Sequence, residues 1–156
     1  MKYQGEFSET FQVAASPEAV RQQFLDLDQV IAHYGDLDSA DRVDDQTLRF
    51  VLTEQNQGVF TFQGRYDCRY QPEGDDGVSW ASVPTDDANI ETHGKLTVRD
   101  GDSPGTAVLD YSASMTLDIE VNKMLAPMLK PVVEAAIAHQ MKDYVKRMIA
   151  AAEARS

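Results

Sequence analysis

The chain has a single cysteine, Cys68, among its 156 residues. One thiol cannot form a disulfide within the chain, and it excludes zinc sites built from several cysteines. No run of about 20 apolar residues, the length that a membrane-spanning helix needs, occurs in the sequence. The first residues also lack the basic stretch followed by an apolar run that marks an export signal. We therefore expect a cytoplasmic protein without an integral membrane segment.

Basic residues are scarce, because 14 Lys and Arg face 26 Asp and Glu and leave a formal net charge of −12. This excess disfavours broad contact with nucleic-acid phosphates or anionic lipids, so no nucleic-acid partner is expected. The charge is uneven along the chain, since basic residues outnumber acidic ones only within residues 122–156. Such an uneven charge distribution would suit a homodimer or docking to a protein partner. Charges near the ends of a helix also occur for an ordinary reason, which is their favourable interaction with the helix dipole.

The familiar motifs of metal and nucleotide chemistry are missing. The sequence contains no HExxH, no CxxC and no GxSxG segment. Its two glycine-rich clusters, GDDG at 74–77 and GDSPG at 101–105, carry aspartates where a phosphate cradle would present bare backbone N–H groups. Both clusters are typical of hairpin turns, and we expect neither a metal nor a cofactor.

Length and composition predict one globular domain over residues 1–156. The chain has a mass of 17.3 kDa, with 42% hydrophobic and 26% charged residues. These fractions are ordinary for a folded domain, and a chain of this length can bury roughly two-thirds of its unfolded surface.

Two short helices are predicted near the start. Ser16 is a favoured N-cap and Pro17 suits the first helical position, because the N–H that proline lacks would be unpaired there. We therefore expect a helix over about residues 17–26. Asp28 can cap a second short helix, and Gly35 is a natural residue to end it.

Apolar side chains alternate with polar ones through most of the first 121 residues, which is the period of a β-strand. Residues 37–54 are expected to form a hairpin that turns at 44–46. One apolar and one polar face per strand indicates an antiparallel sheet with one side toward solvent. The expected strand segments are 5–14, the two arms of 37–54, 58–70, 78–83, 90–98 and 109–121.

The chain ends in a long amphipathic helix, because apolar residues recur every three or four positions from about 122 to 153. Pro127 and Pro131 each remove an internal hydrogen bond, so the regular helix is expected to begin at one of them or to be kinked there. From Pro131 onward, about 20 residues make a rod of roughly 30 Å, which is long enough to cross a small sheet.

The order of elements predicts an α+β fold of one strand, two short helices, six strands and one long helix. The apolar face of a seven-stranded antiparallel sheet must be covered by another element. The long C-terminal helix is the only element of sufficient length. A curved sheet wrapped around this helix encloses a volume. If side chains do not fill that volume, it is a ligand cavity with mostly apolar walls.

Several short segments are similar to a known group. They are Gly5, ASPEAV at 15–20, FTFQGRYD at 60–67, HGKLTV at 93–98 and GTAVLDYSASM at 105–115. With the element order, they resemble the helix-grip fold of the START/Bet v 1-like (SRPBCC) superfamily. The likeness is nearest to its CoxG-like and polyketide cyclase-like branch. The chain departs from that branch at residues 21–24, where a tryptophan is usual, and at 34–36, where a proline-glycine segment is usual.

Three histidines are candidates for a base or a ligand. His93 falls among the residues of its strand that alternate toward the outward face, so its side chain should be exposed to solvent. His139 precedes Asp143 by four positions, which predicts an exposed helical pair. His33 lies at the end of the second short helix, near the expected cavity mouth, and is the best functional candidate of the three.

Polar-tipped aromatic residues on apolar faces are the most informative feature. A buried Tyr hydroxyl or Trp N–H needs a partner, which is backbone, water or a ligand, and plain core packing is the alternative. Tyr66 and Tyr111, with His33, are the only candidate catalytic groups. The predicted ligand pocket comprises Phe24, Tyr34, Phe50, Phe62, Tyr66, Trp80, Thr92, Tyr111, Met115, Met128, Val132 and Ile137.

Three functions remain open at this level. The inward rows carry almost only apolar, Thr and Tyr side chains, which favours a binding or carrier module for a small hydrophobic ligand, aromatic or lipid-like. The second is a polyketide cyclase/dehydratase-like enzyme, which needs a buried acid or base of matched pKa. The resemblance implies a third, a CoxG-like assembly or maturation factor.

Overall fold

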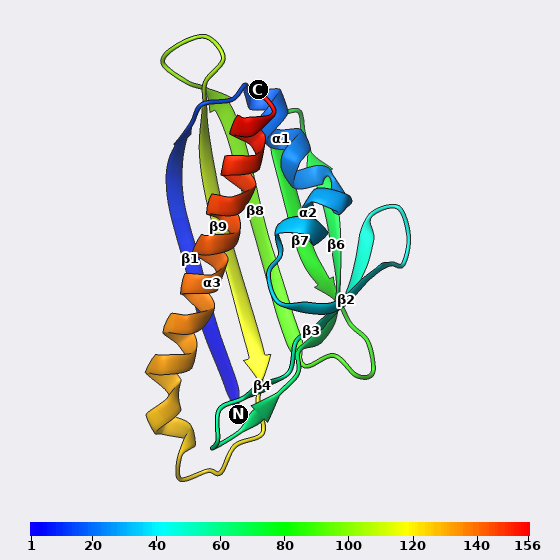
Figure 1. Cartoon of the computed structure of the whole chain (residues 1–156), viewed down its shortest axis with the longest axis vertical. Coiled ribbons are helices and arrows are strands. Elements are labelled where there is room, and N and C mark those ends of the chain that lie inside the picture. Colours follow the sequence, from blue (N-terminus) through cyan, green and yellow to red (C-terminus); the bar gives the residue numbers. More distant parts are fainter.

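A computed structural model describes all residues, 1–156. Three helices lie on one face of a long, curved antiparallel sheet (Figure 1). The elements in chain order are β1 (Lys2–Val13), α1 (Pro17–Leu25), α2 (Leu27–His33), β2 (Leu37–Arg42), β3 (Thr47–Leu52), β4 (Gln55–Asn56), β5 (Thr61–Phe62), β6 (Arg65–Glu73), β7 (Gly77–Val83), β8 (Ile90–Asp100), β9 (Ala107–Asp118) and α3 (Ala126–Ala154). The predicted α+β architecture, with seven strands, two short helices and one long C-terminal helix, is confirmed.

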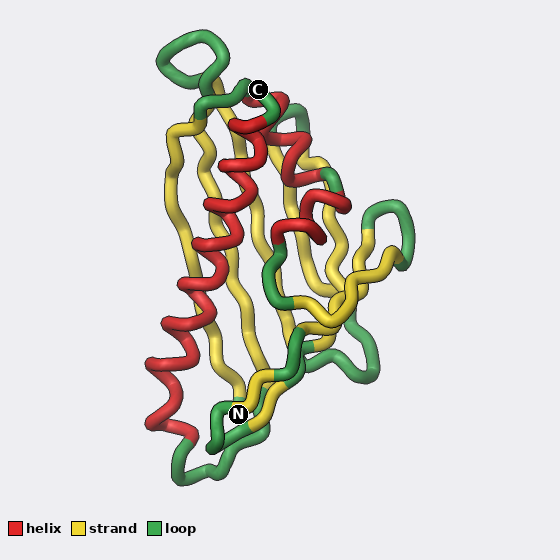
Figure 2. The backbone as a smooth tube through the Cα atoms, viewed as in Figure 1, coloured by secondary structure: helices red, strands yellow, loops and turns green.

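The seven strands of the main sheet follow the order β1-β9-β8-β7-β6-β3-β2, and all neighbours are antiparallel. The chain therefore meanders from β2 to β9, while β1 returns to pair with β9 at the far edge. Strands β4 and β5 form a separate hairpin at the lower end of the sheet (Figure 2). The sheet thus has two edge strands, β1 and β2.

The expected continuous strand over 58–70 is wrong in its first half. Residues 61–62 pair with β4 outside the main sheet, and β6 begins only at Arg65. Gly64 lies at the junction, where an added Cβ would meet Ile90 Cδ1 at 2.5 Å. The alternation of apolar residues continues across Gly64, so the period could not show that the two pieces pair with different strands.

The short helices begin as predicted but are capped differently. Ser16 caps α1 and accepts a hydrogen bond from the Ala19 N–H, with Pro17 in the first turn. The cap of α2 is Asp26, whose carboxylate accepts from the N–H groups of Asp28 and Gln29, so the prediction of Asp28 as the cap is wrong. Because α1 already ends at Leu25, the N–H groups that need a cap lie two residues earlier than expected.

Helix α3 begins at Ala126, before both prolines, and continues through Pro131 to Ala154. Pro127 falls in the first turn, where its missing N–H costs nothing, and Pro131 removes one bond inside the helix. The residues that face the core are Val133, Ile137, Met141, Val145, Met148 and Ala152. No helix in the structure has both the length and the apolar character needed to cross a membrane.

Helix α3 lies along the edge strand β1 (Figure 1). Gly5 permits this close approach, because an added Cβ would meet Ile137 Cβ at 2.6 Å and the Glu134 carbonyl at 3.0 Å. Acidic side chains of α3 also accept from backbone N–H groups of β1 and of Ala14, the residue that follows β1. Glu134 accepts from Gln4 at 2.9 Å and Glu153 accepts from Ala14 at 2.8 Å.

Candidate functional site

Five tyrosines lie at the concave side of the sheet, three of them on its strands and two on the helical elements that cover it. Tyr34 is the C-cap residue of α2, Tyr66 and Tyr70 lie on β6, Tyr111 on β9 and Tyr144 on α3. We call these five residues the tyrosine cluster. Tyr66 and Tyr70 face the same side because alternate residues of a strand share a face. The pairing of Tyr70 with Trp80, of Trp80 with Gly94 and of Gly94 with Ala113 puts Tyr111, two residues from Ala113, on that side as well. Tyr144 reaches the cluster because it lies three positions from Met141 and four from Met148 on the core-facing side of α3.

Aromatic rings join the tyrosine cluster into one continuous group. Phe50 stacks between Tyr34 and Tyr66, with ring centroids 4.5 and 5.1 Å away. Trp80 lies 5.2 Å from Tyr111 and 6.4 Å from Tyr70. Its indole extends over Gly94 of β8, where an added Cβ would come within 2.7 Å of Nε1.

A second set of ring contacts links the sheet to the helices. Phe24 of α1 lies 6.0 Å from Tyr111 and 6.4 Å from Tyr144, measured between ring centroids. The site is therefore built jointly by the sheet, α1, α2 and α3, and none of these elements forms it alone.

The hydroxyls of the cluster are not all paired within the protein. Those of Tyr34 and Tyr66 form a hydrogen bond with each other. No protein group bonds the hydroxyls of Tyr111 and Tyr144 or the Trp80 N–H, and no fully enclosed side-chain polar atom in the structure lacks a partner. These three polar tips therefore border space that a water molecule can reach, and they are free to donate to a bound molecule.

Burial controls the protonation of the cluster. Desolvation raises the pKa of Tyr34, Tyr66, Tyr70, Tyr111 and Tyr144 above the ordinary value of 10.0. Burial also raises the pKa of the Cys68 thiol to about 12, and a hydrogen bond with Tyr70 offsets only part of this. All of these groups are protonated at neutral pH, so they act as hydrogen-bond donors and none is a base or nucleophile.

No charged side chain joins this interior, because the cations around it are engaged elsewhere. Arg147 of α3 donates to the backbone carbonyls of His33 and Tyr34 at 2.9 and 3.0 Å, which ties the end of α2 to α3. Arg155 donates to the buried Gln23 amide oxygen. Lys142 pairs with Glu9 of β1 at 3.3 Å. The site is therefore apolar and aromatic, and its polar groups are neutral donors.

The architecture matches solved structures along almost its whole length. The Zhui aromatase/cyclase of Streptomyces sp. R1128 has a TM-score of 0.69 and 11% identity, with 98% of this chain and 96% of that chain covered. A START superfamily protein of Mycobacterium smegmatis has a TM-score of 0.63 and 17% identity, covering 97% and 99% of the two chains. Norcoclaurine synthase of Thalictrum flavum has a TM-score of 0.59 and 12% identity, covering 100% and 99%. The chain has the START/Bet v 1-like helix-grip fold.

This START/Bet v 1-like likeness concerns the fold alone, because the identities are low. The sequence matches no protein-family model, and no curated protein matches it. The structural neighbours include two enzymes beside a START protein, so they leave open whether this chain is catalytic. The similarity to the CoxG-like branch stays a prediction from the sequence.

Six of the twelve predicted pocket residues come together in one aromatic group within the START/Bet v 1-like fold. Phe24, Tyr34, Phe50, Tyr66, Trp80 and Tyr111 belong to the connected aromatic group. Phe62 and Met115 are half-buried and pack against the core from its lower end. Thr92 is buried, and its hydroxyl already donates to the Ser114 carbonyl at 2.8 Å. Ile137 is buried against Gly5.

The placement of Met128 and Val132 in the pocket is wrong, because these side chains are 71% and 67% exposed. The sequence spacing allowed two adjacent stripes on α3, and the stripe through Ala126, Val133 and Ile137 is the one that faces the sheet. Sequence reasoning also left Tyr70 and Tyr144 out of the pocket. Both carried a signal, since Tyr70 has the inward parity of β6 and Tyr144 lies on the buried stripe of α3.

The histidines lie outside the tyrosine cluster. His93 is exposed and His139 pairs with Asp143 at 3.2 Å on the surface of α3, and both predictions are confirmed. His33 is half-buried, and its Nδ1 lies 3.0 Å from the Gln29 carbonyl of its own helix. No three His, Cys, Asp or Glu side chains come together as metal ligands.

Two hollows lie in the surface outside the interior under α3, although Tyr111 is among the residues that border one of them. One, of about 440 Å³, is on the convex side and is lined by Ser8, Thr10, Lys95, Thr97, Asp110 and Ser112, among others. The other, of about 390 Å³, lies beside β1 and α3 around Gln4, Lys130 and Glu134. Under α3 the aromatic rings are instead in contact with one another, so a ligand that enters there must displace them.

Proposed function

We propose that residues 1–156 act as one binding or carrier module for a small, neutral, hydrophobic ligand with a flat aromatic part. The ligand would lie between the concave face of the sheet and α3. The observation that carries this proposal is the pair of unpartnered hydroxyls, on Tyr111 and Tyr144, inside an aromatic interior without charge. Such hydroxyls suit a carbonyl or phenolic oxygen of a ligand, and the surrounding rings suit its flat faces.

The absence of a free cation in this interior argues for a neutral ligand. A carboxylate or phosphate head group buried beside the tyrosine cluster would lose its hydration without gaining a counter-ion, which is costly. The net charge of −12 also repels anions from the whole molecule. A fatty acid is therefore a poorer ligand than an uncharged aromatic ketone of similar size.

A cyclase-like enzyme is the second candidate, and the Tyr34–Tyr66 pair favours it. Two hydrogen-bonded hydroxyls that keep their protons can polarise a substrate carbonyl, and one structural neighbour is an aromatase/cyclase. Such chemistry also needs a group that accepts protons, and the cluster offers none with a lowered pKa. We therefore place the carrier function first.

Native mass spectrometry of freshly purified protein, before and after organic extraction, tests the carrier function. We expect an adduct of a small apolar molecule that extraction removes. Titration of the extracted protein with fluorenone and fluorene then tests the role of the hydroxyls, with Trp80, the single tryptophan, as the fluorescent reporter. Fluorenone should bind more tightly, because it adds one carbonyl acceptor to nearly the same shape.

The competing functions give different results in these experiments. A protein that carries no adduct and binds neither fluorenone nor fluorene would exclude the carrier function. Turnover of a polyketone substrate, lost in Tyr66→Phe with folding intact, would establish the enzyme instead. The assembly-factor function, the homodimer and the cytoplasmic location stay predictions from the sequence.

A further inference from the structure

The outer side of α3 carries the most exposed large apolar side chains of the molecule. Met124, Met128 and Val132 are 84%, 71% and 67% exposed, whereas the other exposed large apolar residues reach at most 51%. Ala135 and Ala136 continue this side of the helix and are exposed as well. Spacings of three and four residues put these five side chains on one face, which we call the outer stripe.

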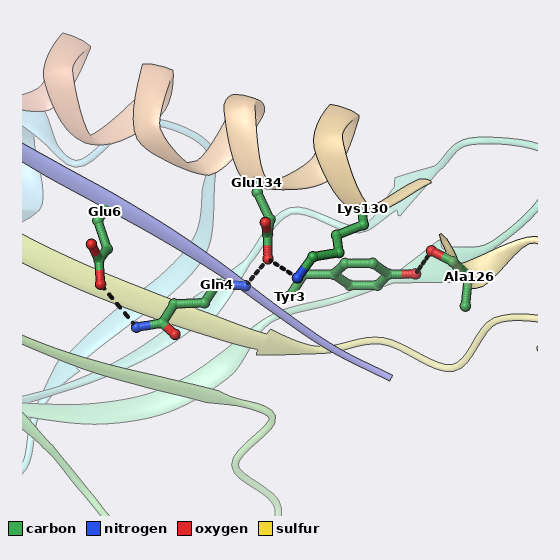
Figure 3. A network of polar contacts seen from close by, with 6 residues as sticks. All are labelled: Tyr3, Gln4, Glu6, Ala126, Lys130 and Glu134. Carbon is green, nitrogen blue, oxygen red and sulfur yellow. Dashed lines mark hydrogen bonds and ion pairs between the residues drawn. The ribbon is translucent and has the colours of Figure 1, made fainter. Parts of the chain in front are cut away.

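The charged side chains of this part of α3 turn away from the outer stripe. Within residues 124–142 the acidic and basic residues are Lys130, Glu134 and Lys142. Figure 3 shows Lys130 and Glu134 directed toward β1, where the Glu134 carboxylate accepts from a backbone N–H at 2.9 Å. Lys130 lies 3.4 Å from the same carboxylate, and Lys142 pairs with Glu9 of β1 at 3.3 Å. The outer stripe is therefore apolar and has no charge of its own.

No other element of the chain covers the outer stripe. Helices α1 and α2 lie beside the half of α3 that ends at the C-terminus, and the other half stands by itself along the edge of the sheet (Figure 1). Single exposed apolar residues are ordinary, but this stripe extends over about three helical turns. A continuous apolar surface of this kind is typical of a contact with another chain.

Opposite charges flank the outer stripe. At its start, the N-cap residue Leu125 provides no side-chain hydrogen bond, and the first turn of α3 contains no acidic residue. Lys123, two residues earlier, is exposed, and no ion pair in the structure involves it. Beyond its other end, the side chain of Asp143 is 44% exposed and pairs with His139. A carboxylate stabilises a helix N-terminus and attracts a lysine, so Asp143 of one copy complements the start of α3 in another.

The charge of the whole chain also favours a second copy over a membrane. Residues 122–156 hold 6 basic and 3 acidic side chains in a chain of net charge −12, so α3 is where two acidic copies repel each other least. The same net charge opposes contact with an anionic lipid surface.

We propose that two copies of the chain form a symmetric dimer through their outer stripes, with the two α3 helices antiparallel. A two-fold axis at position 134 places Leu125 of one copy opposite Asp143 of the other, because both positions are equally far from the axis. The same register places Val132 opposite Ala136, so a larger side chain meets a small one. Each contact occurs twice, as in every two-fold symmetric interface. The dimer is independent of the proposed ligand.

Sedimentation velocity of the full chain over a range of concentrations tests the dimer. A single helix pair makes a small interface, so we expect the mass to rise from 17.3 kDa toward twice that value at micromolar concentrations. Val132→Asp buries a carboxylate near the axis and should raise the Kd at least about tenfold. Val43→Asp is the matched control, because Val43 is 48% exposed in the turn between β2 and β3, and it should leave the Kd unchanged. Circular dichroism checks that both variants fold.

A charge exchange tests the register. Asp143→Lys and Lys123→Asp each place like charges beside one another across the interface, and each should raise the Kd about fivefold. With both substitutions in one chain the attraction is restored, and the Kd should return close to that of the native protein.

Cysteine pairing tests the direction of the helices. On mild oxidation, a mixture of the Val132→Cys and Ala136→Cys proteins should form a disulfide between copies, while the native Cys68 is buried and does not interfere. Met124→Cys should not cross-link to itself, because antiparallel helices keep the two thiols far apart.

Several results overturn the proposal. A mass of 17.3 kDa at every concentration excludes the dimer. A Kd that Val132→Asp leaves unchanged shows that association uses another surface, and self-cross-linking of Met124→Cys shows parallel helices. Binding of a monomeric chain to phosphatidylglycerol vesicles, abolished by Val132→Asp, would assign the outer stripe to a membrane. None of these measurements uses fluorenone, so their failure and the failure of the ligand-binding function are distinguishable.

Discussion

Removing the hydroxyl of Tyr111 should leave the protein as stable as before or more stable. The ring contacts of Tyr111 with Trp80, Phe24 and Phe7, at centroid distances of 5.2, 6.0 and 6.0 Å, do not involve the hydroxyl. Because that hydroxyl has no protein partner and borders space that a water molecule can reach, Tyr111→Phe breaks no protein hydrogen bond. We expect the free energy of unfolding to be unchanged or to rise by up to about 1 kcal/mol.

Tyr66→Phe is the matched comparison, because it removes the same atom from a paired hydroxyl. The Tyr34 hydroxyl would then remain buried without its partner, which costs about 1–3 kcal/mol. Urea denaturation followed by circular dichroism measures the free energy of unfolding of both variants. If their m-values agree, the data are fitted with one common m-value. If Tyr111→Phe loses as much stability as Tyr66→Phe, the Tyr111 hydroxyl is firmly bonded in the folded state. The inference of a free donor would then be wrong.

The same variant separates stability from function. Tyr111→Phe should weaken the binding of fluorenone about fivefold to tenfold through the loss of one hydrogen bond. The affinity for fluorene, which lacks an acceptor, should not change. An equal loss for both molecules would mean that the ring position changed, and the hydroxyl would then have no specific role.

Three other predictions concern pH, packing and reactivity. The tyrosine cluster keeps its protons in the folded chain and ionises near pH 10 when unfolded, so the stability these groups contribute is complete below that pH and is lost above it. Each tyrosine of the cluster should lower the free energy of unfolding by about 1.4 kcal/mol per pH unit above pH 10. A free energy of unfolding, measured by urea denaturation, that stays constant up to about pH 11 would contradict this. Gly94→Ala should displace the Trp80 indole, cost about 1–3 kcal/mol and shift the tryptophan emission, whereas Trp80→Phe in the same chain should recover part of the lost stability. Cys68 should resist thiol reagents until the protein unfolds, because the folded thiol has a pKa of about 12, and rapid labelling of native protein at neutral pH would refute this.

The sequence predicted the sheet well because its strands bury one face. The alternation around Tyr111 and Met115 defines the inward row of β9 without knowledge of its neighbours, and the structure places that row on the concave side. The same reasoning correctly put Tyr66 and Trp80 on this face. A period of two leaves only two choices for each strand, and composition decides between them.

The errors fall where a long-range contact makes the decision. On α3, apolar residues at three- and four-residue spacing form two neighbouring stripes, and the contact between Gly5 and Ile137 determines which of them is buried. Met128 and Val132 were therefore misplaced. The break at Gly64 likewise depends on which strand pairs with each side. Whether rings fill the space under α3 depends on their rotamers, which the pattern of residues does not encode.

The position of α3 along β1 also determines how the molecule can meet other chains. An edge strand normally offers a row of free N–H and C=O groups onto which a foreign strand can add. Here Glu134 and Glu153 occupy free N–H groups near the two ends of β1, and the helix stands in the way of an incoming strand. The opposite edge, β2, is only six residues long and presents the exposed carboxylates of Asp38 and Asp41. One border of the sheet is therefore physically shielded and the other is short and negatively charged, so two copies of this protein have no favourable edge at which to merge their sheets.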